Sequence, residues 1–319
     1  MRDATGERME KQLSVSGALT QWILKEHRSP VVSLYEIGVA VAKIYQEKQY
    51  SGQKIKNIRI GIPRRDSIMG FRKELISLGI IEEKYGLPHD CCEKVSASFR
   101  EGGDMACGID PFCYISHLSA MEYHGLTDRF SKTIFISTVP GPQWKARAVE
   151  KMKRDLGEDL YLLYCEVGLP QLVKYSFKNL NRNPVNILST KFADQGSYIN
   201  LPDRAIRISS IGRTFIDMLR KPDLCGGIKH VLEVYKENSS AYIPLIVAEI
   251  DRHGDPIDKV RAGYVLESVC GITNNSTISS WVRFAQRGGS RVLDPNEDYW
   301  PTFSEKWCLS INVAGIEDE

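Results

Sequence analysis

Four side chains that commonly bind zinc lie within eighteen residues of the segment "CGIDPFCYISHLSAMEYHGLTDR": Cys107, Cys113, His117 and His124. Structural zinc sites usually bring their ligands together in close pairs, with about two to four residues between the members. Here five residues separate the two cysteines and six separate the two histidines. On one helix, His117 and His124 would lie about 10 Å apart along the axis. The spacing therefore favours a structural role for all four residues and predicts that no metal is bound.

The segment "EIDRHGDPIDKVR" gathers acidic side chains that could hold a divalent cation, as nucleases do. Its candidate ligands are Glu249, Asp251, His253, Asp255 and Asp258. Asp255 precedes Pro256, however, and this order is typical of a helix N-cap. Arg213 and Asp217, four residues apart, would form an ion pair on one helix. Because the sequence has no Walker loop, G-x-S-x-G motif or nucleotidyltransferase signature, it predicts a non-enzyme without a cofactor. A metal-dependent nucleic-acid-processing enzyme is the less favoured alternative.

Basic side chains are densest in "KIKNIRIGIPRRDSIMGFRK", residues 54–73, which holds seven Lys and Arg residues and one acid. A solvated surface is the common role of such a stretch. The flanking pattern offers another role. Helices are expected at 18–28, at 30–48 after a Ser29 cap and Pro30, and at 67–78, and a strand and turn follow near 79–88. This order predicts a winged helix-turn-helix-like DNA-binding domain over residues 1–105.

A basic helix that packs through one apolar face can enter the major groove of DNA, which is about 12 Å wide. Ile68, Phe71, Leu75 and Leu78 would form the apolar face of the helix at 67–78. We therefore expect the DNA contacts to come from Arg64, Arg65, Ser67, Arg72 and Lys73. Arg64 and Arg65 would bind phosphates at the start of the helix. Arg72 would reach base edges further along it.

The second predicted domain, residues 106–319, follows a Gly-rich and charged segment at 98–110 that is typical of a junction. Residues 130–208 are expected to be rich in strands, with a helix at 142–157. The expected strands are at 133–140, 160–167, 172–177, 185–190 and 205–210. Residues 209–290 are expected to be helical. The fold class is then mixed α/β (α+β): a winged helix-turn-helix-like module, a mixed α/β domain and a helical part.

Two motifs of the second domain resemble the AbiEi antitoxins of bacterial type IV toxin–antitoxin (abortive infection) systems. They are "YISHLSAMEYHGLTDR" at 114–129 and "SIGRTFIDMLRKPDLCGGIKHVLEVY" at 210–235. The resemblance is densest over residues 110–240. It implies that 106–319 is an AbiEi-like antitoxin domain. The positions that match its motifs are Ser116, His117, Ser119, His124, Arg213 and Asp217.

The resemblance implies two activities: binding of double-stranded operator DNA to repress the protein's own operon, and neutralisation of an AbiEii-like nucleotidyltransferase toxin without a stable complex. With no apolar run near the roughly 18 residues that span a bilayer, we expect a cytoplasmic protein with no membrane partner. Eight cysteines without a disulfide-like spacing are expected to be reduced thiols. A repressor with a ligand-sensing second domain would share these features, so a ligand-responsive transcriptional repressor is the main alternative.

Overall fold

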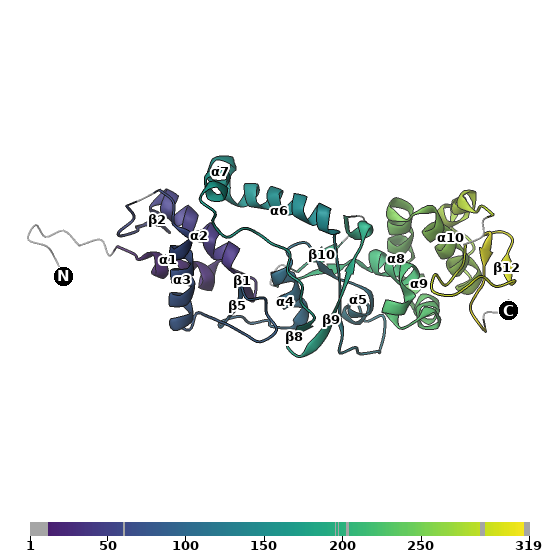
Figure 1. The fold of residues 1–319 in the computed structure, drawn as a ribbon. Coiled ribbons are helices and arrows are strands. Elements are labelled where there is room, and N and C mark those ends of the chain that lie inside the picture. Colours follow the sequence, from purple (N-terminus) through teal and green to yellow (C-terminus); the bar gives the residue numbers. More distant parts are fainter. Residues whose placement is uncertain are drawn as a thin grey trace, which may run out of the picture. The chain divides into compact units, whose positions relative to one another are not determined.

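The structure, a computed structural model, describes residues 12–59, 61–194, 196, 198–201, 204–287 and 291–315. The chain forms two compact units that alternate along the sequence (Figure 1). Unit 1 comprises Met1–Phe112, Pro140–Arg182 and Pro202–Ala205, and unit 2 comprises Cys113–Val139, Asn183–Leu201 and Ile206–Glu319. The chain therefore leaves unit 1 and returns to it twice. Among the described residues, no helix is both long and apolar enough to cross a membrane.

The first part of unit 1 has the element order of a winged helix-turn-helix domain. The elements are α1 (Val15–Lys25), β1 (Val31–Ser33), α2 (Leu34–Glu47), a hairpin of β2 (Gln49–Tyr50) and β3 (Gln53–Lys54), α3 (Arg65–Ser77), β4 (Ile81–Glu82) and β5 (Cys91–Lys94). The strands β1, β5 and β4 form an antiparallel sheet in that order. The fold class predicted for this region is confirmed, and β1 and β5 are additions to it.

The start of α2 differs from the prediction. Residues 31–33 form β1, and the helix begins at Leu34 with Ser33 as its N-cap. Ser33 and Glu36 form a capping box, in which the Ser33 hydroxyl accepts from the backbone N–H of Glu36 and the Glu36 carboxylate accepts from that of Ser33. The S-x-x-E spacing stabilises this start better than Ser29 and Pro30 would, because two otherwise unpaired backbone donors are satisfied.

Four further elements complete unit 1: α4 (Gly102–Ile109), α6 (Gly141–Leu156), α7 (Glu158–Glu166) and β8 (Asn179–Leu180). Helices α6 and α7 share the core of α1–α3, and the Tyr35 hydroxyl donates to Asp155 Oδ2 at 2.7 Å. The domain boundary predicted between residues 105 and 106 falls inside α4. Helix α4 packs so closely on β1 that a Cβ at Gly108 would lie 3.0 Å from that of Val31. The Gly-rich segment is therefore part of the packed unit.

Unit 2 contains a mixed sheet followed by a helical part. Its first elements are β6 (Tyr114–Ile115), α5 (His117–Tyr123), β7 (Ile134–Thr138), β9 (Asn183–Ser189), η1 (Lys191–Asp194), β10 (Tyr198–Asn200) and β11 (Arg207–Ser209). The sheet order is β10-β11-β6-β7-β9, in which β11–β6 and β7–β9 are parallel and the other pairs antiparallel. The register of β7 and β9 pairs Ile134 with Val185 and Thr138 with Ser189.

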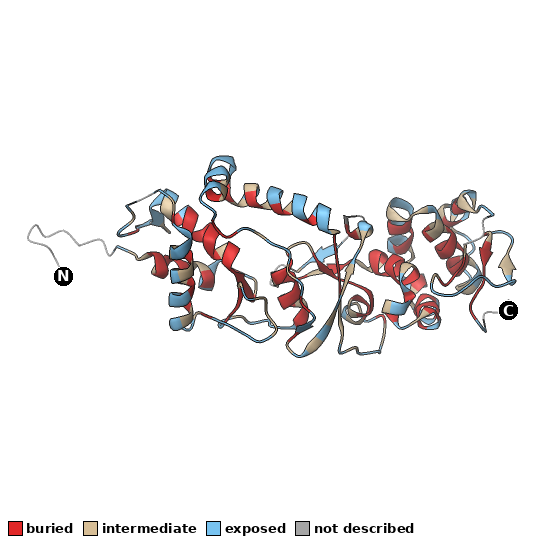
Figure 2. Ribbon diagram, in the orientation of Figure 1, coloured by how far each residue is buried: buried red, intermediate tan, exposed pale blue. Residues whose placement is uncertain are grey.

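The helical part of unit 2 shares one core with α5. Its elements are α8 (Ile211–Arg220), η2 (Pro222–Cys225), α9 (Ile228–His253), α10 (Pro256–Tyr264), the π-helix η3 (Val265–Val269), α11 (Ser276–Ser280), η4 (Trp281–Phe284) and the hairpin β12 (Phe303–Ser304) and β13 (Leu309–Ser310). Figure 2 shows α8 buried along most of its length. Gly212 permits this, because a Cβ there would meet the carbonyl oxygen of Leu245 on α9 at 2.5 Å.

Two predictions for 130–208 are wrong. The strand expected at 160–167 lies almost entirely within α7, and residues 172–177 form no strand. The mainly apolar "LYLLYCE" suits either element, and periodicity cannot separate a short apolar strand from a helix. Here one side of α7 is buried, with Leu160 and Tyr164 four residues apart, whereas Leu162 and Leu163 are exposed. The predicted strands at 133–140, 185–190 and 205–210 and the helix at 142–157 are confirmed as β7, β9, β11 and α6.

Candidate functional site

Unit 1 carries six exposed cations within residues 54–73, before α3 and along it, here called the basic surface. Its members are Lys54, Lys56, Arg59, Arg64, Arg65 and Lys73. Arg64 is the N-cap residue of α3, and no side chain caps this end of the helix. The first backbone N–H groups of α3 therefore add a partial positive charge beside the Arg64 and Arg65 guanidinium groups. Ser67 is half-buried in the first turn and does not cap the helix.

Arg72 is not part of the basic surface, which corrects the prediction that it reads base edges. Its side chain is 10% exposed and donates from Nη2 to Glu83 Oε1 at 2.9 Å and to the carbonyl oxygen of His89 at 3.0 Å. The eight-residue spacing from Arg64 does not place Arg72 on the same face of the helix. Eight residues are more than two full turns, so the two side chains point in different directions. Arg72 instead holds α3 against the segment that links β4 and β5.

That linking segment, residues 83–90, is the wing of the domain. Its strands pair Ile81 with Lys94 and Glu82 with Glu93. Within the wing, Tyr85 is completely exposed. Gly86 follows with a φ of +92°, a conformation that favours glycine. The wing therefore presents an aromatic side chain at a tight bend, and its base is joined to α3 by Arg72.

The motif residues of α5 form internal hydrogen bonds in unit 2. Ser116 is the N-cap residue of α5, but its hydroxyl bonds with Ser137 Oγ at 2.9 Å and with His117 Nδ1 at 2.7 Å. Ser119 Oγ accepts from the backbone N–H of Phe135 at 3.0 Å. His124 Nε2 lies 2.7 Å from the carbonyl oxygen of Ser209. These contacts attach the short helix to β7 and β11.

His117 combines burial with an unusual backbone. It is 2% exposed and has a φ of +52°, which is uncommon for residues other than glycine, although Asn, Asp and His adopt it more often than the rest. Burial lowers the pKa of His117, against an opposing effect of Asp217. The pKa of His124 is also lowered by burial. Both imidazoles are therefore held in their neutral form near pH 7.

Arg213 and Asp217 form the predicted ion pair, with 3.0 Å between Nε and Oδ1, and both side chains are almost completely buried. Arg213 Nη2 also donates to the Tyr114 hydroxyl at 3.1 Å and to the carbonyl oxygen of Phe192 at 2.8 Å. This network joins α8 to the sheet. A buried ion pair with several hydrogen bonds fixes the positions of the residues around it. If either side chain moved away, the other would remain as an unpaired charge in an apolar interior, which costs free energy.

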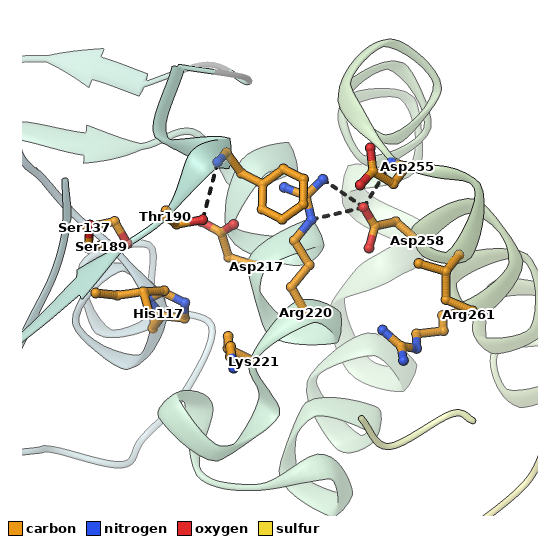
Figure 3. Close-up of a pocket in the computed structure, with 13 residues that line it drawn as sticks. His117, Ser137, Ser189, Thr190, Asp217, Arg220, Lys221, Asp255, Asp258 and Arg261 are labelled. Carbon is orange, nitrogen blue, oxygen red and sulfur yellow. Dashed lines mark hydrogen bonds and ion pairs between the residues drawn. The ribbon is translucent and has the colours of Figure 1, made fainter. Parts of the chain in front are cut away.

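Asp217 and His117 both face a cavity of about 380 Å³ within unit 2 (Figure 3). Its lining comprises His117, Ser137, Leu188, Ser189, Thr190, Phe192, Asp217, Arg220, Lys221, Asp255, Ile257, Asp258 and Arg261. The sheet supplies one wall through the ends of β7 and β9, and α8 and α10 supply the other. Small-ligand pockets have roughly 300–1,000 Å³, so this cavity is large enough to be one.

Sequence reasoning missed the three cations of this cavity. Arg220 donates from Nε and Nη2 to Asp258 Oδ2, at 2.9 and 2.6 Å. Lys221 follows it at the end of α8, and Arg261 donates from Nε to the carbonyl oxygen of Val292 at 2.9 Å. The spacing of Arg220 from Asp217, three residues on a helix, was the available signal that both lie on one face.

The acidic residues of the alternative enzyme site have protein partners. Asp258 binds Arg220 and accepts from the backbone N–H of Asp255, and Asp255 is the predicted N-cap of α10. Asp251 accepts from Trp281 Nε1 at 2.9 Å. Among the described residues, no three His, Cys, Asp or Glu side chains are grouped so that they could hold a metal ion. Cys107 and Cys113 are buried free cysteines.

Comparison with known proteins gives little further guidance. No family model and no curated protein matches the sequence. One solved structure with a similar arrangement is the RV2827C protein from Mycobacterium tuberculosis, which is 10% identical, with a TM-score of 0.46, over 92% of this chain and 90% of that one. This loose likeness carries no conclusion about family or function.

Proposed function

We propose that this chain is a DNA-binding antitoxin of the AbiEi type, which represses its own operon through unit 1. The observation that carries the DNA-binding part is the pairing of a winged helix-turn-helix topology with the basic surface. In such domains a helix lies in the major groove and the wing lies along the neighbouring backbone. Six exposed cations within residues 54–73, before α3 and along it, suit an interaction with phosphates.

In this arrangement Arg64 and Arg65 bind phosphates where α3 meets the DNA backbone. Lys73, two turns further along and exposed, contacts a second phosphate. Gly70 lies between them on α3 with open space around it, so the helix backbone can approach the groove closely. Tyr85 of the wing contacts the adjacent sugar–phosphate backbone. Arg72 contributes indirectly, because it fixes the wing relative to α3.

The antitoxin part of the proposal rests on the resemblance of residues 114–129 and 210–235 to the AbiEi family. Its partner would be an AbiEii-like nucleotidyltransferase toxin, neutralised in the cytoplasm without a stable complex. The motif residues His117, Arg213 and Asp217 act here as the framework of unit 2. They support the surface or cavity that performs neutralisation and need not touch the toxin themselves.

Two measurements on the full-length chain test the proposal. Gel shifts with the DNA upstream of its own gene should give a specific complex that unrelated DNA does not displace. Co-expression with the product of an adjacent nucleotidyltransferase gene should restore growth, and variants of the basic surface should still restore it. A chain that fails to bind its promoter is not the repressor, and a chain that fails to restore growth is not the antitoxin.

The second candidate function is a ligand-responsive transcriptional repressor. The cavity of unit 2 favours it, because a pocket of about 380 Å³ with charged and hydroxyl groups in its lining has the size of a small-ligand site. An antitoxin has no need of such a pocket to bind DNA. The two functions differ in genome context: a neighbouring toxin gene supports the antitoxin, and a metabolic operon supports the sensor.

A further inference from the structure

We propose that the cavity of unit 2 binds a phosphate monoester carried by a small hydroxyl-bearing molecule, namely a sugar phosphate or a mononucleotide. The cavity lies between the ends of β7 and β9 and the helices α8 and α10 (Figure 3). The cations and the hydroxyl groups of its lining come from different elements. This proposal does not rest on DNA binding or on toxin neutralisation.

The balance of charges in the lining favours a dianion. Its three carboxylates already have cationic partners: Asp217 pairs with Arg213, Asp258 pairs with Arg220, and Asp255 pairs with Lys191 at 3.9 Å. Lys221 and Arg261 also line the cavity, and among the described residues neither forms an ion pair. Two positive charges are therefore in excess, which matches the charge of about −2 on a phosphate monoester near pH 7.

Two buried polar atoms of residues that line the cavity lack a hydrogen-bond partner in the described part of the chain. Arg220 Nη1 and Asp217 Oδ2 have no hydrogen-bond partner among the described residues, although the two side chains are only 8% and 5% exposed. A buried polar atom without a partner costs about 1–3 kcal/mol, so such atoms usually serve a purpose. Nη1 offers a donor to a phosphate oxygen. Oδ2 offers an acceptor to a hydroxyl group, which the phosphate group of a monoester does not supply as a dianion.

The sheet side of the cavity suits the hydroxyl-bearing part of the ligand. Ser137, Ser189 and Thr190 line it with hydroxyl groups that can both donate and accept. Ser137 is fixed by its bond to Ser116 Oγ, which in turn bonds His117 Nδ1. The neutral His117 ring completes this wall. The cation side and the hydroxyl side together match a molecule with a phosphate at one end and hydroxyls at the other.

Titration calorimetry on the full-length protein tests this proposal with six probes: ribose 5-phosphate, glucose 6-phosphate, adenosine and guanosine 5′-monophosphates, inorganic phosphate and unphosphorylated ribose. At least one organic phosphate should bind with one site per chain and at least tenfold more tightly than inorganic phosphate or ribose. Tighter binding of a sugar phosphate identifies that class, and tighter binding of a nucleotide identifies the other. Failure of all four organic phosphates to bind would overturn the proposal.

Lys221→Met is the decisive variant, because Lys221 is exposed and its removal leaves no buried charge unpaired. Affinity for the organic phosphate should fall at least tenfold. Lys229→Met is the matched control, an exposed lysine on α9 outside the cavity, and should bind as the unaltered chain does. Arg220→Lys keeps a charge beside Asp258 but removes Nη1, and should also weaken binding. Equal affinities in Lys221→Met and Lys229→Met would show that the phosphate binds elsewhere.

Discussion

Arg72 and Glu83 form an ion pair, with 2.9 Å between Nη2 and Oε1, that joins helix α3 to the wing of unit 1. The same nitrogen donates to the carbonyl oxygen of His89 at the other end of the wing. One buried guanidinium thus sets the position of the wing relative to the helix that we place in the major groove. A substitution at Arg72 should therefore act on the wing as well as on α3.

Arg72→Ala should lower the stability of unit 1 by about 1.5–3 kcal/mol, because it removes hydrogen bonds from a charged group in a largely buried position. DNA affinity should fall to a similar extent for all sequences, since the wing no longer has its support. Lys73→Ala is the control: it should leave thermal unfolding unchanged and weaken DNA binding through one phosphate. An Arg72→Ala variant of normal stability with altered base preference would contradict this role.

Asp217→Ala should destabilise unit 2 by about 3–5 kcal/mol, because it leaves the Arg213 guanidinium charged in a site that is 2% exposed. The Tyr114 hydroxyl and the Phe192 carbonyl, which also bind Arg213, are neutral acceptors, and the nearby Glu249 carboxylate offsets only part of the charge. Denaturant unfolding followed by circular dichroism measures the effect. A destabilisation below about 1 kcal/mol would mean that solvent reaches Arg213 in the folded chain.

Two glycine substitutions should change the stability of the folded chain in opposite directions. Gly212→Ala should cost about 1–3 kcal/mol, because its Cβ would meet backbone oxygen of α9 at 2.5 Å and backbone cannot move aside cheaply. Gly70→Ala, on the exposed side of α3 with nothing within 4 Å, should stabilise by about 0.5–1 kcal/mol through helix propensity. Melting temperatures of the two variants give the comparison. A stabilising Gly212→Ala would refute the close approach of α8 and α9.

Stability should decrease as the pH falls below about 6.5, the usual pKa of histidine in an unfolded chain. Burial lowers the pKa of His117 and His124 in the folded chain, so the unfolded chain binds more protons in this range and is favoured by acid. Each histidine contributes a slope of up to about 1.4 kcal/mol per pH unit.

His117→Asn should reduce the slope of stability against pH. The part of the slope that comes from His124 should remain. Asparagine tolerates the positive φ of this position better than most residues, so the backbone should keep its course. The measurement is denaturant unfolding at pH 5, 6 and 7. An unchanged slope in the variant would show that His117 titrates normally in the folded chain.

The sequence predicted much of unit 1 and the helices of unit 2, because their signals are local. Apolar residues at helical spacing predicted α3, and the Asp–Pro pair at 255–256 predicted the start of α10. Ser29 and Pro30 are also a local signal, and they predicted the start of α2 too early. The helix begins instead after the capping box of Ser33 and Glu36, four residues further on. Local signals compete, and only the packed structure selects among them.

The division into units and the cavity could not be predicted in this way. Nothing local in 140–182 indicates that α6 and α7 pack on α2, a contact that depends on pairs such as Tyr35 and Asp155, 120 residues apart. Arg220 and Asp258 meet across 38 residues. Arg72 was placed on the wrong side of α3 because the sequence gives no sign that Glu83 and His89 return to it. Pairings between distant segments decide all three features.

The salt dependence of promoter binding tests the central claim most directly. For the Arg64→Ala/Arg65→Ala variant, fluorescence anisotropy across a range of salt concentrations should show weaker binding to all DNA. Its slope of log K against log salt should be shallower by about 0.9 for each phosphate that the variant no longer neutralises. Lys229→Ala/Lys236→Ala removes two exposed charges from α9 of unit 2 and should bind as the unaltered chain does. If the Arg64/Arg65 variant keeps the affinity and slope of the unaltered chain, the basic surface is an ordinary solvated face and α3 does not bind DNA.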